Sequence, residues 1–260
     1  MEKESFKKII TIDNAIDVLM ALSSQSGKSI RELGHELDIS KSTLHRILLT
    51  LKSRDFVKQD PISEKYSLGY QILELSIKLK EQSKLRDMAL PYMKKLSNLT
   101  GDTVQLGILD KDEILILESI EGTNLLRVFS QAGQRFPITY GNFGKVFLSQ
   151  MSTNKINEFI ERYPLKKYAM NSITDPKLFL ERIEKVKNEN ISISEDDPTD
   201  GAISLVVPVR DETDNIVGAI SLALAKTPKV MDSVDELRNV VKQTANDITN
   251  KLKELALANT

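Results

Sequence analysis

Near the start of the chain, apolar residues recur three times at the spacing of one face of a helix. The first stretch lies within 11–27, the second within 29–38, and the third follows Ser40. Ser29 and Glu32 have the spacing of a capping box, in which each side chain satisfies a free backbone N–H group of the other residue. In the third helix, these residues are expected to face the core: Leu44, Ile47, Leu48 and Leu51.

The residues that follow predict a hairpin and then two helices. Two short runs within 56–69 flank a turn at Pro61 and Ser63, and this pattern is typical of paired strands. Residues 69–82 alternate partly like a strand, but their leucine, glutamate, glutamine and lysine content favours a helix. We therefore interpret 69–82 as a helix that bridges two domains, and we expect a second helix over 85–99.

Beyond Gly101, strands and helices mix without the regular alternation of parallel βαβ units. Strands are predicted on both sides of a turn at 110–112 and at 125–133, 191–194, 202–209 and 215–224. Helices are predicted at 142–150, 154–162 and 176–190. A closing helix carries Ser233 and Glu236 at capping-box spacing, with an apolar face that reaches Leu255. This order favours an α+β fold with an antiparallel sheet.

Composition narrows the classes of protein and of site. The 260 residues include no cysteine, which excludes disulfides, thiolate nucleophiles and cysteine-based metal sites. No apolar run approaches the roughly 18 residues of a membrane span, and the polar start does not predict a signal peptide. We therefore expect a cytoplasmic protein without a membrane partner. The net charge is −1, yet Ser40–Lys65 holds six basic and three acidic residues.

Helix, turn, helix and hairpin in this order are typical of a winged helix-turn-helix. Hydroxyls and N–H groups at the start of the third helix could bind phosphate or base edges, and Arg46 could form a two-pronged contact with guanine. Lysines of the hairpin would meet the DNA backbone. The candidate DNA-binding residues are Ser29, Ser40, Lys41, Ser42, Thr43, His45, Arg46, Lys58 and Lys65. The alternative is an ordinary helical bundle with a polar outer face, and for His45 plain exposure explains the pattern equally well.

Three segments in the correct order resemble the IclR-type transcriptional regulators, and together they extend the likeness over nearly the whole chain. Residues 21–60 are similar to that family's winged helix. Residues 126–151 resemble a segment of its effector domain, in which a glycine-bearing loop precedes a Gly-Lys helix start, here Gly144-Lys145. Residues 191–224 resemble its C-terminal strand pair.

The resemblance implies a domain order and a set of partners. It implies a winged helix-turn-helix over 1–68, a linker helix over 69–84 and a GAF-like effector-binding domain over 85–260. It also implies a homodimer that pairs through the DNA-binding half, with frequent assembly into a dimer of dimers. Since a symmetric dimer requires symmetric DNA, we expect an imperfect palindrome as the operator. A repressor is the first hypothesis, and an activator is the alternative.

The same resemblance implies a site for a small organic acid between the sheet and the loop before Gly144. Matched position by position, the effector-binding residues fall on Asn142, Phe143, Ser194, Ser204, Ser221 and Ala223. Hydroxyl and amide donors suit a carboxylate or carbonyl group. Ser204 replaces a common cysteine, Ser194 stands where an acid can occur, and Phe143 replaces a small residue. These departures disfavour a glyoxylate- or pyruvate-type ligand and leave a sugar-derived acid such as keto-deoxy-gluconate equally plausible.

Other classes of chemistry have weaker support in the sequence. His35 lacks the second histidine of a zinc-binding helix, and the acidic loop 195–200 does not match an EF-hand. We therefore expect no metal site, no cofactor and no catalytic residue. An enzyme and a pure interaction scaffold remain rival hypotheses. For an enzyme, no histidine lies nearby in the sequence to activate a serine nucleophile, and a scaffold would leave the Ser42–Arg46 face without a role.

Overall fold

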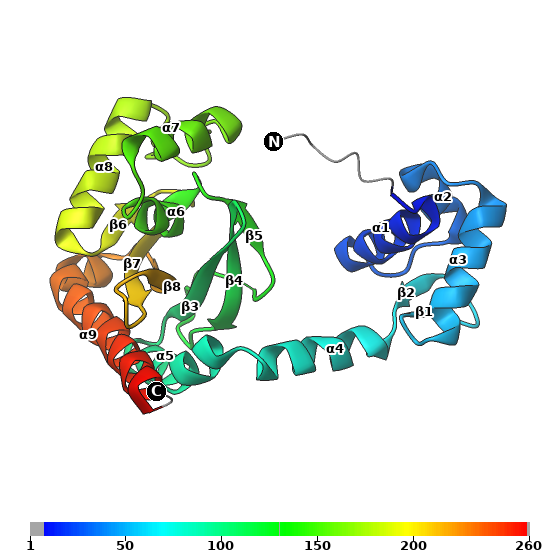
Figure 1. Ribbon diagram of the computed structural model, residues 1–260, viewed down its shortest axis with the longest axis horizontal. Coiled ribbons are helices and arrows are strands. Elements are labelled where there is room, and N and C mark those ends of the chain that lie inside the picture. The colour runs from blue at the N-terminus through cyan, green and yellow to red at the C-terminus, as the bar shows by residue number, and fades with distance from the viewer. Residues whose placement is uncertain (1–7, 130, 259–260) are drawn as a thin grey trace. The chain divides into compact units, whose positions relative to one another are not determined.

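The computed structural model describes residues 8–129 and 131–258, and it divides into two compact units, Met1–Gln82 and Ser83–Thr260 (Figure 1). The first unit contains α1 (Ile10–Ser24), α2 (Ile30–Leu37), α3 (Lys41–Ser53), β1 (Val57–Gln59), β2 (Tyr66–Leu68) and α4 (Tyr70–Glu81). The predicted helices and hairpin of this half are thus confirmed. The separate bounds of a winged helix and a linker helix stay a prediction.

A small core holds the first unit together. The side chains that form it are Val18, Ala21, Leu22, Leu33, Leu44, Ile47, Leu48, Val57 and Tyr66. Strand β1 pairs antiparallel with β2, and Lys28 adds an isolated bridge to Tyr66, so the hairpin is fastened to the segment before α2. Gly69 follows β2, and a Cβ there would lie 1.9 Å from the Asp55 carbonyl oxygen. Only glycine permits this close approach of two backbone segments.

The second unit is built around a six-stranded antiparallel sheet with the order β5-β4-β3-β8-β7-β6. Its helices are α5 (Lys84–Thr100), α6 (Gly141–Leu148), α7 (Thr153–Arg162), α8 (Pro176–Glu189) and α9 (Pro228–Ala258). Its strands are β3 (Thr103–Asp110), β4 (Glu113–Ile120), β5 (Arg135–Pro137), β6 (Ser192–Glu195), β7 (Ala202–Arg210) and β8 (Ile216–Ala225). The antiparallel α+β fold predicted from the sequence is confirmed.

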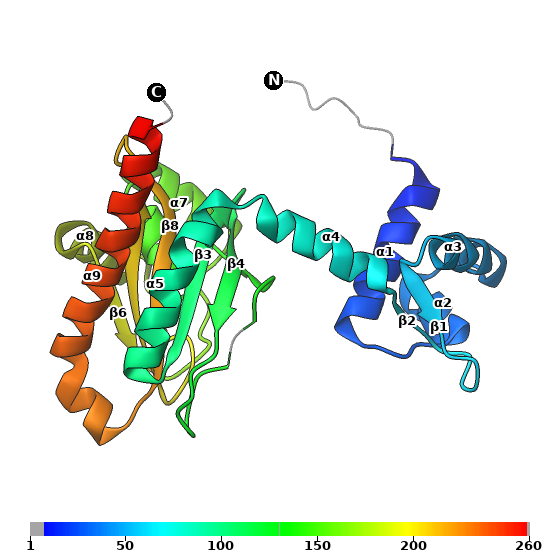
Figure 2. The ribbon, with the colours of Figure 1, turned by 90° about the horizontal axis from the view of Figure 1, so that it is seen from below.

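Helices cover both faces of this sheet, so the unit has three layers. Apolar residues of α5 and α9 pack with one set of sheet residues, and Figure 2 shows these two helices side by side. Residues of α6, α7 and α8 pack with another set, in a separate apolar cluster. Strand β7 shows why both layers are needed: Leu205 and Val207 belong to the first cluster, whereas Val206 belongs to the second. A strand buried on both faces does not need polar alternation.

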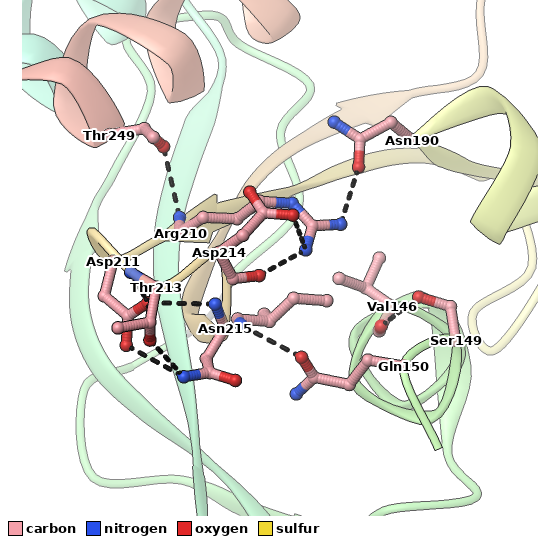
Figure 3. Close-up of polar contacts among 11 residues, drawn as sticks. Val146, Ser149, Gln150, Asn190, Arg210, Asp211, Thr213, Asp214, Asn215 and Thr249 are labelled. Carbon is pink, nitrogen blue, oxygen red and sulfur yellow. Dashed lines mark hydrogen bonds and ion pairs between the residues drawn. The ribbon is translucent and has the colours of Figure 1, made fainter. Parts of the chain in front are cut away.

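The turn between β7 and β8 is fastened to the helices around it (Figure 3). The Arg210 guanidinium donates to the Asp214 carbonyl oxygen at 2.8 Å and to Asn190 Oδ1 at 3.1 Å, while the Arg210 backbone N–H donates to Thr249 Oγ1 at 3.1 Å. Asn190 ends α8 and Thr249 lies in α9. One arginine therefore ties the hairpin to both helical layers.

Two local predictions are wrong. No described residue of 125–133 lies in a strand, and Ser130 lies outside the described residues; the strand that pairs with β4 is instead Arg135–Pro137.

Ser233 does not cap the closing helix, because α9 begins five residues earlier. There the Val230 N–H donates to the Thr227 hydroxyl, immediately before Pro228. Ser233 lies inside the helix and its hydroxyl donates to the Lys229 and Val230 carbonyls.

Leu255, which the sequence places on the apolar face of the closing helix, is 38% exposed. The buried positions of that face are Val241, Ala245 and Ile248. The apolar periodicity thus continues beyond the part of the helix that packs on the sheet. The prediction of the face is correct in the middle of α9 and wrong at its end.

Candidate functional site

The outer face of α3 is polar and exposed. Lys41, Ser42, His45 and Arg46 all lie on it, whereas Leu44, Ile47 and Leu48 are buried on the opposite side. Leu49 and Thr50 extend the exposed face by another turn. The side chains predicted to read DNA therefore share one surface, and the core of the unit fixes the orientation of the helix that carries them.

Hydroxyl groups are linked to one another at the start of α3. Ser40 is the N-cap: its Oγ accepts the Thr43 N–H at 3.3 Å and donates to Thr43 Oγ1 at 2.9 Å. Ser42 Oγ lies 3.2 Å from Ser40 Oγ. Ser40 is thus committed to stabilising the helix start, whereas Ser42, which is also exposed, does not cap the helix. Any DNA contact by Ser40 would be additional to its cap.

Ser29 is also a cap residue. It forms the predicted capping box with Glu32: the Ser29 N–H donates to Glu32 Oε2 at 2.7 Å, and the Glu32 N–H donates to Ser29 Oγ at 3.2 Å. These bonds to Ser29 hold the pKa of the Glu32 carboxyl below its ordinary value, with a smaller contribution from the charge of Lys65. The start of α2 therefore lies near the lysine of the hairpin.

The hairpin presents two exposed lysines. Lys58 Nζ lies 5.0 Å from the centroid of the Tyr70 ring, which is within cation–π range. Lys65 follows a tight turn in which Asp60 Oδ1 accepts the Ile62 and Ser63 N–H groups, at 3.1 and 2.7 Å. The turn leaves Ile62 93% exposed at its tip. The hairpin thus has the charge and the rigidity of a wing that contacts a nucleic-acid backbone.

In the second unit, a cavity of about 260 Å³ opens between the sheet and the start of α6. We call it the effector cavity. Its lining residues are Gln105, Ile114, Ile116, Val128, Phe129, Gln134, Phe136, Tyr140, Gly141, Asn142, Phe143, Asp197, Pro198, Thr199, Ala202, Ile203, Ser204 and Ala223. Aliphatic and aromatic side chains dominate this lining, as in most sites for small organic ligands.

The structure brings four of the six predicted effector residues to the cavity: Asn142, Phe143, Ser204 and Ala223. Ser221 lies beneath, only 1% exposed, with its Oγ 3.5 Å from Ser204 Oγ. Ser194 does not line this cavity and faces a neighbouring groove. Asn142 and Phe143 lie in the first turn of α6, inside the helix predicted over 142–150.

Asn142 is fully engaged with protein groups. Its amide nitrogen donates to Ser194 Oγ at 2.7 Å and to the Ser204 carbonyl oxygen at 3.0 Å, and its amide oxygen accepts from Ser192 Oγ at 2.8 Å. Ser194 Oγ in turn donates to the Asp197 carbonyl oxygen at 2.6 Å. Since an amide nitrogen has two donor hydrogens, Asn142 has none left for a ligand. It positions the cavity wall.

A buried ion pair completes this network. Lys145 Nζ lies 2.8 Å from Asp197 Oδ2, and both side chains are less than a tenth exposed (6% and 9%). Among the described residues that line the effector cavity, Asp197 is the single charged one. Its partner Lys145 neutralises it, so the side chains of the lining offer no free cation to an anionic ligand. The donors that remain for an anion are uncharged: backbone N–H groups at the start of α6 and the amide and hydroxyl side chains of the lining.

The start of α6 is open on the cavity side. Tyr140 precedes the helix and forms no capping hydrogen bond with its side chain. First-turn N–H groups of a helix have no partner within the helix, and the helix dipole adds a favourable field for anions. Gly141 has φ +63° and lies against Pro198, so the chain turns sharply into the helix there. The geometry favours a carboxylate at this end.

Aromatic rings form part of the cavity wall next to the start of α6. Phe136 stacks on Tyr140 with ring centroids 4.7 Å apart, and Tyr140 meets Tyr168 edge-on at 4.8 Å. Burial raises the pKa of the Tyr140 hydroxyl, and Tyr168 and Asp197 add to this effect. These rings and Gln105 were missed from the sequence. Tyr140, two positions before Asn142, could have been found as the residue that precedes the helix start.

Comparisons with known proteins match both units. Residues 11–61 match the family model described as the IclR helix-turn-helix domain, and residues 78–250 match the bacterial transcriptional regulator IclR C-terminal model. The regulator KdgR of Escherichia coli is 29% identical over 224 residues, which cover 86% of this chain and 84% of KdgR. The repressor AllR of Escherichia coli is 22% identical over 242 residues, covering 93% of this chain and 89% of AllR.

One solved structure of similar fold contains a small molecule. It is an IclR homolog from Microbacterium hydrocarbonoxydans in complex with 4-hydroxybenzoate, with a TM-score of 0.80 and 19% identity, and the match covers 93% of this chain and 98% of the homolog. Within the described residues of the present chain, no helix is long and apolar enough to span a membrane. The same residues include no cluster of three acidic or histidine side chains placed to hold a metal.

Proposed function

The chain belongs to the IclR family of bacterial transcriptional regulators, and from that premise we propose that it is a repressor that releases its operator when a small organic acid fills the effector cavity. The observation that carries the proposal is the pairing of an apolar cavity with an open helix start in the second unit. The repressor AllR, which is related over most of the chain, supports repression over activation. A regulator that binds operator DNA would act in the cytoplasm.

For DNA recognition, we assign base reading to the exposed face of α3 and backbone contact to the hairpin. Arg46 is exposed in the middle of that face, and its guanidinium has the fork geometry that suits guanine. Lys41, Ser42, Thr43 and His45 would lie along the same groove, since they share its surface. Lys58 and Lys65 would contact phosphates, together with the caps Ser29 and Ser40 at the helix starts.

A homodimer would present two such faces to the two halves of an imperfect palindrome. Support comes from apolar side chains that the first unit does not bury. The residues concerned on α1 are Ile10, Ile12, Ile16 and Met20, and those on α4 are Tyr70, Leu73, Leu75, Ile77 and Leu79. Such surfaces typically mark protein contacts. Assembly of two dimers into a tetramer is the larger form of the same proposal, and light scattering distinguishes the forms.

We favour, as the effector, a monocarboxylic acid with an apolar or aromatic body. The carboxylate would accept N–H groups at the start of α6, and the body would lie among Phe129, Phe136 and Tyr140. A sugar acid carries several hydroxyls that need partners, whereas most of the cavity lining is apolar and the Asn142 amide is already bonded to Ser194 and to the Ser204 carbonyl. The 4-hydroxybenzoate bound by the homologous structure has the chemistry that this lining favours.

A thermal-shift screen followed by gel retardation tests the proposal. Aromatic monocarboxylic acids, sugar acids and short keto acids are added to the full-length protein, and each acid that raises the melting temperature is tested for release of operator DNA. A ligand at a hundredfold excess over its Kd should stabilise by about 2.7 kcal/mol. Ser204→Leu, which narrows the cavity, should abolish this stabilisation and leave DNA binding without ligand intact. A sugar acid that binds and releases DNA while aromatic acids do neither would overturn the ligand class.

A further inference from the structure

A second concave site lies beside the effector cavity, between α8 and the edge strand β6. We call it the α8 groove. It has a volume of about 460 Å³, larger than the effector cavity, and it is lined mainly by polar side chains. Its charged lining residues are Lys145, Arg182, Lys185, Glu189, Glu195, Asp197 and Arg238. Strand β6 is the last strand of the sheet, and no described residue pairs with its outer edge as a further strand.

Positive charge in the α8 groove exceeds the negative charge available to balance it. Lys145 and Asp197 neutralise each other at 2.8 Å, and Glu195 lies 3.4 Å from Lys226, which does not line the groove. Three cations then remain against one acid, because Arg182, Lys185 and Arg238 face Glu189 alone. Glu189 is far from saturating them: Lys185 approaches it only to 3.6 Å and Arg238 only to 3.5 Å.

Arg238 also has an unused donor. Its Nε is buried and has no hydrogen-bond partner among the described residues. A buried donor of a charged group that lacks an acceptor destabilises the fold more than a neutral one does. An acceptor in the groove would remove this cost. The Arg182 guanidinium has no ion pair within the described part of the chain, so it is available to the same acceptor.

The spacing of the cations along α8 places them on one side of the helix. Arg182, Lys185 and Glu189 follow the i, i+3, i+7 pattern of a single helical face, whereas Ile183 and Val186 pack into the core. Arg238 approaches from α9. Two arginines and a lysine from two helices thus surround one space. Guanidinium forks match the oxygens of phosphate and carboxylate groups, and a lysine adds a point charge.

We propose that the α8 groove binds a small anion with a charge of −2 or more, in the form of a phosphate ester or a polycarboxylate. Arg182, Lys185 and Arg238 hold the charged group, and Nε of Arg238 finds its acceptor there. The apolar residues Ile173 and Leu178, at the same groove, accommodate the body of the ligand. The site is separate from the effector cavity, although Asp197 lines both.

Isothermal titration of the full-length protein with pyrophosphate and with citrate tests this proposal. Ionic strength is held constant with sodium chloride, so that general screening does not change between samples. We expect saturable binding with one anion per chain. The two probes distinguish the sources of the anionic group: tighter binding of pyrophosphate assigns the site to phosphate esters, and tighter binding of citrate assigns it to polycarboxylates.

Matched variants localise the binding. Arg182→Gln with Lys185→Gln should weaken the anion at least tenfold. Lys177→Gln with Lys187→Gln removes the same charge from α8 at exposed positions outside the groove, and it should change the affinity less than twofold. Arg238→Lys keeps the charge but removes the Nε donor, and it should weaken binding severalfold. Absence of saturable binding of both probes, or an equal loss in the two double variants, would overturn the proposal.

Discussion

The ring of Phe143 lies directly against Gly107, so closely that a Cβ on the glycine would come within 2.5 Å of Phe143 Cε1. Gly107 is a buried residue of β3, next to a register shift in the pairing with β4. Phe143 lies in the first turn of α6 and lines the effector cavity. The Phe143 ring can therefore occupy this position only because residue 107 has no side chain. The ring in turn forms part of the wall of the effector cavity.

Gly107→Ala should push the Phe143 ring from its place and destabilise the second unit by about 1–3 kcal/mol, the usual cost of overpacking. In a Phe143→Ala background the same substitution should cost little, because the clashing ring is gone. Urea unfolding of the four proteins gives the coupling energy, which we expect to reach about 1 kcal/mol or more. An equal cost of Gly107→Ala in both backgrounds would show that the clash lies elsewhere.

The buried ion pair of Lys145 and Asp197 gives a second prediction. Lys145→Met leaves the Asp197 carboxylate buried without its partner, and we expect a loss of about 3–5 kcal/mol. Adding Asp197→Asn removes the unpaired charge and should restore part of that loss. Lys251→Met, which breaks an exposed pair with Glu254 in the same unit, should cost less than about 1 kcal/mol. Chemical denaturation of these variants measures all three effects, and a double variant less stable than Lys145→Met contradicts the prediction.

The acidic loop after β6 gives a prediction about pH. Hydrogen bonds from Lys226 and from the Gly201 N–H hold the pKa of the Asp196 carboxyl below its ordinary value. The folded state therefore binds fewer protons than the unfolded chain over this range, and stability rises with pH. The contribution is complete above the ordinary aspartate pKa of about 3.9 and is lost as the pH falls through the lower folded value.

Asp196→Asn should accordingly be less stable than the natural chain at neutral pH, and the difference should narrow as the pH falls below about 4. Unfolding midpoints measured across this range provide the test. Asp235→Asn, at an exposed position of α9, controls for the removal of one negative charge. A difference that stays constant down to the acid transition would assign the role of Asp196 to its shape and not to its charge.

Several helices of this fold could be predicted because the residues that cap a helix start lie next to it in the sequence. Ser29 and Glu32 form the capping box that their spacing predicts, and Ser40 caps the helix predicted to follow it. The Ser233 error has the same origin: two residues had the right spacing, but Thr227 and Pro228 form the stronger local signal. Local rules locate a helix start well when a single candidate is present.

The strand error has a different cause. Residues 125–133 were predicted to form a strand, yet Leu125 is 99% exposed and the short segment Arg135–Pro137 pairs with β4. Which of two nearby segments joins a sheet edge depends on tertiary contacts and not on composition. The role of Asn142 could not be predicted from the sequence either, because it also depends on tertiary contacts. Its partners Ser194 and Ser204 lie 52 and 62 residues further along the chain.

The last prediction separates the two kinds of DNA contact. Arg46 is exposed on the face of α3, where a guanidinium can form two hydrogen bonds with one guanine, so Arg46→Ala should weaken operator binding by about 1–3 kcal/mol and relax the base preference at one position. Lys58 lies on the hairpin and should contact a phosphate. Lys58→Ala should therefore weaken binding to operator and to unrelated DNA equally, and it should reduce the salt dependence of binding by about one charge.

Gel retardation at several salt concentrations, with operator and scrambled DNA, measures both effects. Lys94→Ala, at an exposed position of α5 in the other unit, provides the control for loss of a positive charge. Equal losses on operator and scrambled DNA for Arg46→Ala would exclude base reading by that residue, and the other exposed side chains of α3 would then have to supply the specificity.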